Sequence, residues 1–272
     1  MSRIANLSYH FLLYRRMIGM SIRSQMQYRT SFLMMTFGQF GMTLIEFMGV
    51  WSLFSRFGNL RGWQLAEVAL FYGVVSIAFA LAEGFARGFD TFSRLIVSGD
   101  FDRLLLRPCS TVFQVACREV QVMRVGRLIQ GCVVLTFACT HLTLHWTLAK
   151  VLLILFTLVA GAFLFTGLMV LQAVVAFWTI ESLEVFNIFT YGGVETGQYP
   201  LTIYRPWLKW GFTFVVPIAC INYLPLGLVF EKHDLLQPQS WHYFAPTMGI
   251  LFFLASLQLW KLGERYYLST GN

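Results

Sequence analysis

The sequence predicts an all-α integral membrane protein, and three observations lead to this prediction. Hydrophobic residues make up 57% of the 272 residues and charged residues only 12%, against about 45–50% and about 25% in soluble domains. The mean hydropathy is +0.63. The apolar residues also form long runs, rather than the alternating pattern of a soluble helix. Because so few charges cannot cover a water-soluble surface, lipid is expected to solvate most of the chain.

Six apolar segments are predicted to cross the membrane, because a hydrocarbon core of about 30 Å takes about 20 helical residues. A transmembrane domain is therefore expected over 31–272. The fifth span contains Pro217 and Pro225, and each proline removes a helical hydrogen bond, so we expect this span to be broken or partly re-entrant. The predicted spans lie at about 31–53, 68–86, 128–146, 151–177, 210–229 and 243–262.

The positions of the arginines and lysines predict the orientation of these spans. With six crossings both termini lie on one side, and 16 of the 20 basic residues fall on that side. The opposite side receives only Arg56, Arg61, Lys150 and Lys232. The positive-inside rule then predicts cytoplasmic termini in a bacterial cytoplasmic (inner) membrane. The net charge of +7 is explained by this orientation, and no nucleic-acid partner is expected.

Residues 1–30 are predicted to form an amphipathic helix in the headgroup plane of the membrane. No unbroken apolar core precedes a small-residue cleavage site, so a signal peptide is not expected. Arg16 and Arg23 occupy the face opposite an apolar stripe. The alternative is an ordinary cytoplasmic extension. The apolar stripe recurs at three- or four-residue steps and consists of Leu7, Phe11, Tyr14, Ile18, Ile22 and Met26.

The cytoplasmic segment at about 92–108 contains two short helical pieces, punctuated by Gly99 and Pro108. Its second piece mixes acidic and basic residues with apolar ones. Such a helix suits docking onto a soluble partner, or lying on the membrane surface with a solvated charged face. Just before it, Gly84 and Gly88 form a small-xxx-small pair that permits close approach of two helices.

Two carboxylates, Glu46 and Glu83, fall within or near apolar spans. A charge at the centre of a span costs roughly 2.5–3.5 kcal/mol, so each is expected to face protein or water. They are candidates for an intramembrane polar site that serves a substrate or pairs helices; the alternative is a protonated or snorkelling carboxylate near the interface. His141 and His145 stand four residues apart with no third ligand nearby, and no metal site is predicted.

Four segments together resemble a known family of membrane proteins. The run Ser-Gly-Asp-Phe-Asp-Arg-Leu-Leu-Leu-Arg-Pro at 98–108 resembles the signature between the second and third helices of membrane subunits of type-2 ATP-binding-cassette (ABC) exporters. The segments 191–204, 217–225 and 263–271 are similar to segments of one poorly characterised branch of these permeases. The resemblance therefore extends over nearly the whole chain.

The resemblance implies a permease subunit that forms half of a transport pathway and couples to a separate ABC ATPase subunit. It implies six transmembrane helices, the N-terminal amphipathic helix, and a coupling helix at about 92–108. A second permease subunit is expected, often a different protein, which would make a heterodimer, with a homodimer as the other possibility. By this likeness the residues at or near the ATPase contact are Asp100, Phe101, Asp102, Leu105, Arg107 and Pro108.

Catalysis is not expected in this chain. The sequence contains no G-x-x-x-x-G-K-[ST] phosphate loop, so ATP and Mg are expected in the partner ATPase, and no cofactor, catalytic residue or metal ligand is assigned here. Two alternatives are a membrane-embedded enzyme and a secondary transporter, each acting on a lipid or small molecule. The first lacks a set of intramembrane polar residues, and the second usually shows repeated halves, which are not evident.

Overall fold

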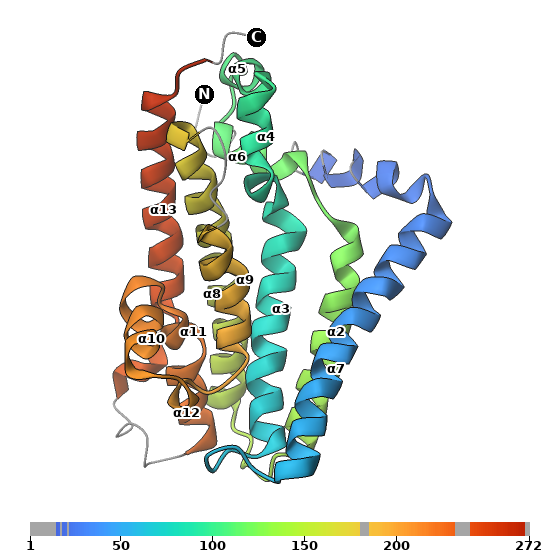
Figure 1. Cartoon of the computed structure of the whole chain (residues 1–272), viewed down its shortest axis with the longest axis vertical. Helices are drawn as coiled ribbons and strands as arrows, with labels where there is room; N and C mark the ends of the chain where they lie inside the picture. The colour runs from blue at the N-terminus through green and yellow to red at the C-terminus, as the bar shows by residue number, and fades with distance from the viewer. Residues whose placement is uncertain (1–14, 17, 21, 180–184, 232–239, 270–272) are drawn as a thin grey trace.

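A computed structural model describes the chain except for residues 1–14, 17, 21, 180–184, 232–239 and 270–272. The described residues form helices and turns, and their one β-bridge, between Leu60 and Trp63, is isolated. Long helices run roughly along the long axis of the molecule, and shorter ones lie at one end and beside the long helices (Figure 1). The long helices are α2 (Arg29–Phe57), α3 (Leu65–Asp90), α7 (Val125–His141), α8 (Leu148–Thr179) and α13 (Thr247–Tyr266).

Helices α2 and α3 are both strongly apolar, but for different physical reasons. Helix α3 is packed against α7 on one side and α8 on another, so most of its apolar span lies inside the protein. Helix α2 contacts α7, and its large apolar side chains, such as Met34 and Phe37, are exposed. These side chains must face lipid or another subunit, because an aqueous surface would not tolerate so many.

A tight hairpin joins α2 to α3. Helix α2 ends where Gly58 adopts a left-handed conformation (φ 73°), and the Gly58 amide donates to the Phe54 carbonyl oxygen at 2.8 Å. Helix α3 begins with a capping box, in which the Gln64 amide donates to the Glu67 carboxylate at 2.9 Å. Between them the buried Trp63 indole donates to the Thr202 hydroxyl at 3.0 Å, which ties the hairpin to the distant segment η2 (Leu201–Ile203).

Four helical segments of the described chain are long and apolar enough to cross a membrane. They are Arg29–Phe57, Leu65–Val97, Val122–His141 and Leu148–Thr179, and they overlap the first four predicted spans. A bent pair of helices raises this number to five. Helix α13 overlaps the sixth predicted span and has 20 residues, but its last turns carry Lys261, Glu264 and Arg265 and it does not meet the same apolar criterion. The count of six spans stays a prediction.

The region of the predicted fifth span is bent by 76° between Pro206–Val215 and Ile218–Phe230. The break falls at Pro217, as its missing amide hydrogen leads one to expect. Pro225 lies in the first turn of a helix, where amide hydrogens have no intrahelical acceptor, so it breaks nothing. The elements here are α9 (Val185–Gly197), α10 (Pro206–Trp210), the π-helix η3 (Gly211–Val215), α11 (Ile218–Ile221), α12 (Tyr223–Phe230) and η4 (Ser240–Phe244).

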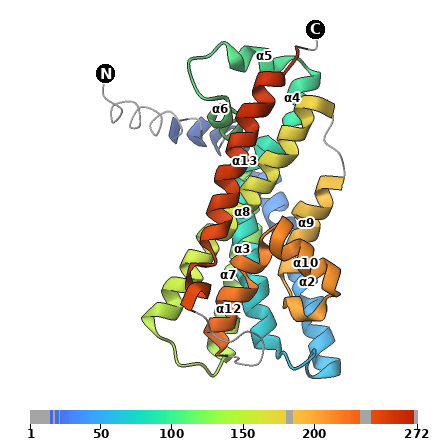
Figure 2. The same ribbon diagram turned by 90° about the vertical axis from the view of Figure 1, so that its left-hand side faces the viewer.

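The described part of the N-terminal segment is helical at residues 15–16, 18–20 and 22–26. In both views it runs across the direction of α2 (Figures 1 and 2). Of the predicted apolar stripe, Ile18 and Ile22 line an apolar cavity against α3. Met26 is 41% exposed, and the other three members, Leu7, Phe11 and Tyr14, lie outside the described residues.

The predicted close approach at the small-residue pair occurs at Gly88 but not at Gly84. A Cβ atom at Gly88 would overlap the carbonyl oxygen of Val115 on α6 (Thr111–Arg118), whereas a Cβ at Gly84 would meet nothing within 4 Å. Gly88 therefore sets the distance between α3 and α6.

Replacing Gly88 by alanine is expected to destabilise the protein by about 1–3 kcal/mol, because the backbone of α6 must move to admit the methyl group. Gly84→Ala, one turn earlier on the same helix, is the matched control and should be neutral or stabilising by up to about 1 kcal/mol. Thermal unfolding of the purified variants in detergent measures both. Equal melting temperatures for the two variants would contradict the assignment of the close contact.

Candidate functional site

The segment between α3 and α7 forms one end of the molecule, beside the C-terminus (Figure 1). It consists of α4 (Phe92–Val97), α5 (Asp100–Leu105), α6 and the 3-10 turn η1 (Val122–Arg124). Gly99 adopts a left-handed conformation (φ 68°) between α4 and α5, which a residue with a Cβ atom rarely accepts. This glycine allows the chain to turn sharply and to present α5 at the tip.

An aromatic cluster joins this tip to the long helices. Phe101 of α5 is fully buried, with its ring centroid 5.1 Å from Phe92, 5.5 Å from Phe177 of α8 and 4.9 Å from Tyr267. Trp260 of α13 is also fully buried, 4.8 Å from Phe92. Edge-to-face aromatic pairs contribute about 0.5–1.5 kcal/mol each beyond their burial. The cluster therefore fixes α4 and α5 to both α8 and α13.

Helix α6 is fastened to the same cluster by polar contacts. The buried Trp260 indole donates to the Thr111 hydroxyl of α6 at 3.1 Å. The Gln114 side-chain amide donates to the carbonyl oxygens of Leu104 and Cys109, both at 3.0 Å. These contacts hold the corner between α5 and α6 in one shape.

The exposed surface of this corner differs in part from the predicted contact set. Leu106 is 86% exposed, the Arg103 side chain is 81% exposed, and Leu105, Arg107 and Pro108 are also exposed. Leu106 and Arg103 were not singled out from the sequence. The spacing of Phe101 and Leu104, three residues apart on one face of α5, could have placed the intervening and following residues outward.

Three of the predicted contact residues have partners within the chain. The Phe101 side chain lies inside the aromatic cluster, so it can support a contact surface but cannot belong to it. Asp100 accepts from Arg118 at 3.1 Å, and this hydrogen bond holds the pKa of the Asp100 carboxyl below its ordinary value. Asp102 accepts from the Ser269 hydroxyl at 2.6 Å. The pKa of Tyr267 is raised to about 12, mainly by burial and secondly by the Asp102 carboxylate.

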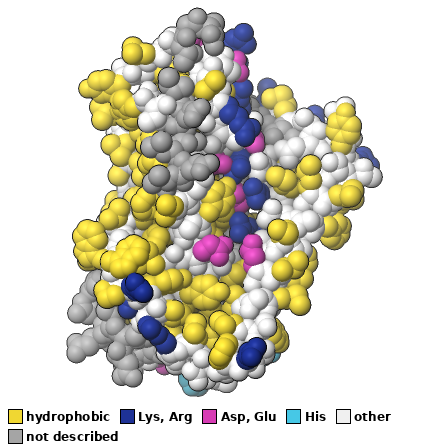
Figure 3. All heavy atoms as spheres, in the orientation of Figure 1, with side chains coloured by type: hydrophobic (Ala, Val, Ile, Leu, Met, Phe, Trp, Pro, Cys, Tyr) yellow, Lys and Arg dark blue, Asp and Glu magenta, His cyan; other side chains and the backbone are white. Residues whose placement is uncertain are grey.

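A second polar site lies along α3, where a row of charged side chains interrupts the apolar surface (Figure 3). Its centre is Glu83, whose side chain is fully buried. The Glu83 carboxylate lies 3.1 Å from Arg124, 3.4 Å from Arg127 and 3.5 Å from Arg87. Arg87 also pairs with Asp90 at 2.6 Å. Three guanidinium groups around one carboxylate offset the desolvation cost of burying it.

Arg127 brings the two predicted intramembrane carboxylates together. It pairs with Glu83 on α3, lies 3.9 Å from Glu46 on α2, and stacks over the Phe79 ring at 5.0 Å. The Tyr72 hydroxyl donates to the Glu46 carboxylate at 3.4 Å. Glu195 on α9 lies within electrostatic reach of both Glu46 and Arg127. Glu46 and Glu83 therefore belong to one network that joins α2, α3, α7 and α9.

The arginines of this network were assigned from the sequence to a cytoplasmic loop. Arg124 and Arg127 instead belong to the apolar segment Val122–His141, and Arg87 lies in the last turn of α3. The pairing of Arg124 and Arg127 with Glu83 could not be identified because Glu83 is more than 40 positions from Arg127. Arg87 stands four residues from Glu83 on the same helix, a spacing that indicates an ion pair. Glu195 escaped notice since no helix was predicted over α9, whose 13 residues include three glycines.

Within the described ranges, no three His, Cys, Asp or Glu side chains come together in a group that could hold a metal ion. The tip is instead an exposed surface anchored on the helices, and the charged network is a helix-pairing device inside a membrane-spanning fold. These features define a multi-pass helical membrane protein whose α5–α6 corner, the terminal corner, is packed against α8 and α13.

The comparisons with known proteins identify the family. Residues 40–271 match the family model described as ABC-2 family transporter protein. The chain therefore belongs to the ABC-2 transporter family, as the resemblance of its short motifs predicted, and it is a membrane permease of an ABC transporter. This family implies an ATPase partner. No curated protein and no solved structure matches the chain.

Removing the charge of Glu83 should destabilise the protein strongly, because Arg124 and Arg127 would stay buried without their counter-ion. We expect Glu83→Gln to lower the free energy of unfolding by about 3 kcal/mol or more. The matched control is Glu231→Gln, since Glu231 pairs with Lys150 at 2.6 Å but its side chain is 60% exposed; a loss below about 1 kcal/mol is expected there. Thermal or detergent-induced unfolding compares the two, and similar losses would count against the buried network.

Cys117 provides a test of the packing of α6. Its thiol is buried, and this burial raises its pKa to about 12, so the unreactive neutral thiol dominates at every pH well below that value. In single-cysteine variants, N-ethylmaleimide should label Cys117 more slowly than the half-buried Cys109. The Cys117 rate should still rise between about pH 7 and pH 10. A plateau within that range would show that the thiol is not buried.

Proposed function

We propose that this chain is the permease subunit of an ATP-driven exporter in a bacterial inner membrane, with both termini cytoplasmic. It forms half of a transport pathway and takes its energy from a separate ATPase subunit that binds ATP and Mg. The chain itself has no enzymatic activity and no cofactor. Membership of the ABC-2 family supports this proposal, and the geometry of the terminal corner carries it further.

The single observation that carries the coupling role is an exposed turn on a buried anchor. Leu105 and Leu106 are exposed next to Arg107 and Pro108, and an apolar surface with flanking charge is typical of a protein contact. Because the Phe101 ring is packed against α8 and against Trp260 of α13, a push on the turn moves these helices as one body. This is what a coupling helix must do to convert closure of two ATPases into a change of access.

The location of two carboxylates supports a second permease subunit. The Glu46 side chain is 43% exposed on α2, a candidate membrane span, and Glu195 is exposed on α9 within electrostatic reach of Glu46. Exposure of carboxylates to hydrocarbon is costly. A second permease, either a different protein or a second copy of this chain, covers this face in the proposed complex and encloses the pathway.

The ATPase contact can be tested by site-specific photo-crosslinking in cells. A photoreactive amino acid at Leu106 should form an adduct with a subunit that carries an ATP-binding phosphate loop, identified by mass spectrometry. The matched control is Val97, which is 51% exposed at the end of α4. Val97 precedes α5 and does not belong to the exposed turn at Leu105–Pro108. Leu106→Asp should also reduce co-purification of that subunit at least about tenfold. An adduct at Val97 but not at Leu106 would overturn the assignment.

A further inference from the structure

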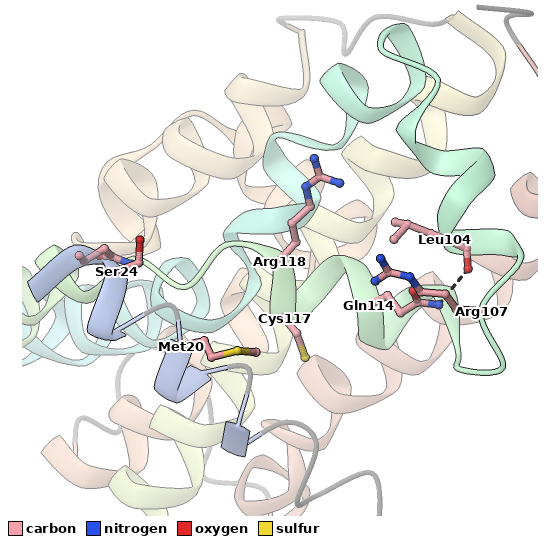
Figure 4. A pocket seen from close by; sticks show the side chains of 8 residues that line it. Met20, Ser24, Leu104, Arg107, Gln114, Cys117 and Arg118 are labelled. Carbon is pink, nitrogen blue, oxygen red and sulfur yellow. Dashed lines mark hydrogen bonds between the residues drawn. The ribbon is translucent and has the colours of Figure 1, made fainter. Parts of the chain in front are cut away.

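A cavity of about 490 Å³ lies between the N-terminal helix and the corner of α5 and α6. Figure 4 shows Met20 and Ser24 of the N-terminal helix on one side, Arg107 and Gln114 on the other, and Cys117 and Arg118 between them. This cavity shares Arg107 with the proposed contact with the ATPase. None of its lining residues belongs to the charged network of α3.

The walls of this cavity are fixed by hydrogen bonds between segments far apart in the sequence. The Gln25 side-chain amide donates to the Val120 carbonyl oxygen, and its oxygen accepts from the Val122 amide at 3.1 Å. These two bonds attach the N-terminal helix to the segment that follows α6. On the other wall, Gln114 holds the backbone of Leu104 and Cys109. The cavity is therefore a built feature rather than a gap between loose segments.

Two guanidinium groups give the cavity a preference for anions. No carboxylate of the described chain lies within ion-pair distance of Arg107, which is exposed. Arg118 gives one nitrogen to Asp100 at 3.1 Å, and a guanidinium has five N–H donors in all. Donors therefore remain for a second partner, and Arg groups recognise phosphate oxygens well.

Gln114 adds the requirement that a ligand also carry a hydrogen-bond donor. Its residue is 5% exposed, and its side-chain oxygen has no hydrogen-bond partner among the described residues. A buried acceptor left without a donor costs about 1–3 kcal/mol. A ligand that fills this cavity should thus carry an anionic phosphate and also a hydroxyl or ammonium group that donates to Gln114.

The surroundings indicate that such a ligand comes from the bilayer. Ile18 and Ile22 of the same N-terminal helix line a second cavity of about 240 Å³ on the side of α3, walled by Ala80, Leu81 and Phe85. The helix is therefore apolar towards the membrane span and more polar towards the first cavity, as expected for a helix at headgroup depth. The cavity of Arg107 and Arg118 adjoins this same helix at Met20, Ser24 and Gln25.

We propose that this cavity binds the headgroup of a membrane glycerophospholipid. Arg107 and Arg118 hold the phosphate diester, and the glycerol hydroxyl or ethanolamine ammonium donates to the Gln114 oxygen. The bound lipid links the N-terminal helix to the α5–α6 corner. This inference does not depend on the proposed export function, because it concerns the permease chain alone.

Native mass spectrometry of the purified full chain in detergent tests the proposal. Phosphatidylglycerol and phosphatidylethanolamine should bind, and Arg107→Gln and Arg118→Gln should each weaken binding roughly tenfold, equal to about 1.4 kcal/mol. Arg103→Gln is the matched control, because Arg103 also pairs with Asp100, at 3.6 Å, but does not line the cavity. Its lipid binding should equal that of the unchanged protein.

Three outcomes would overturn the proposal. The first is equal lipid binding by the unchanged protein and both cavity variants, and the second is a loss in Arg103→Gln as large as in Arg118→Gln. The third is equal binding of diacylglycerol, which lacks the phosphate. If glycerol 3-phosphate competes as well as the intact lipid does, the phosphate site stands but its lipid source is wrong. Arg107→Gln changes an exposed side chain, so a folded variant is available for the comparison.

Discussion

The burial of Phe101 and Trp260 is the contact on which the geometry of the terminal corner depends. Both side chains are fully buried, and together with Phe92 and Phe177 they join α4, α5, α8 and α13. Helix α5 has only six residues, and so short a helix has little stability of its own. Its conformation therefore comes from the packing of one aromatic side chain. That packing leaves the following residues exposed, and it gives the exposed turn a rigid connection to the long helices.

The network around Glu83 solves a different problem, which is to join apolar helices inside a membrane. Hydrophobic burial gives little drive for helices to associate in lipid, so small residues and polar contacts take over. A small residue and a polar contact both occur where α7 packs against α2 and α3. Gly126 lets the backbone of α7 approach the Thr36 carbonyl oxygen of α2 closely, and one residue further Arg127 pairs with α3. Arg127 also lies 3.9 Å from Glu46, whose side chain is 43% exposed.

The sequence predicted the helical membrane class and the family because these rest on composition and on local motifs. It predicted a break in the fifth span for the same reason, since the effect of a proline is local, but it did not show that the break falls at Pro217 and not at Pro225. It did not predict that Arg127 is buried and Arg124 half-buried beside Glu83, because Glu83 is distant in sequence from both. Nor did it show that α2 is largely exposed and α3 largely buried, since the same apolar sequence suits contact with lipid or with protein. Phe101 was assigned at or near the ATPase contact, and the pattern of α5 does not reveal that Trp260 and Tyr267 cover its ring.

Helix α6 connects α3, α5 and α13 with the N-terminal helix. Its first residue accepts a hydrogen bond from Trp260, Val115 touches Gly88 of α3, and its last residue, Arg118, pairs with Asp100 of α5. The segment after it accepts and donates hydrogen bonds with Gln25 of the N-terminal helix. A displacement of α5 must therefore be shared by α6, because a hydrogen-bonded and close-packed contact resists small deformations. The N-terminal helix then moves with the corner, so that any molecule bound between them takes part in the same motion.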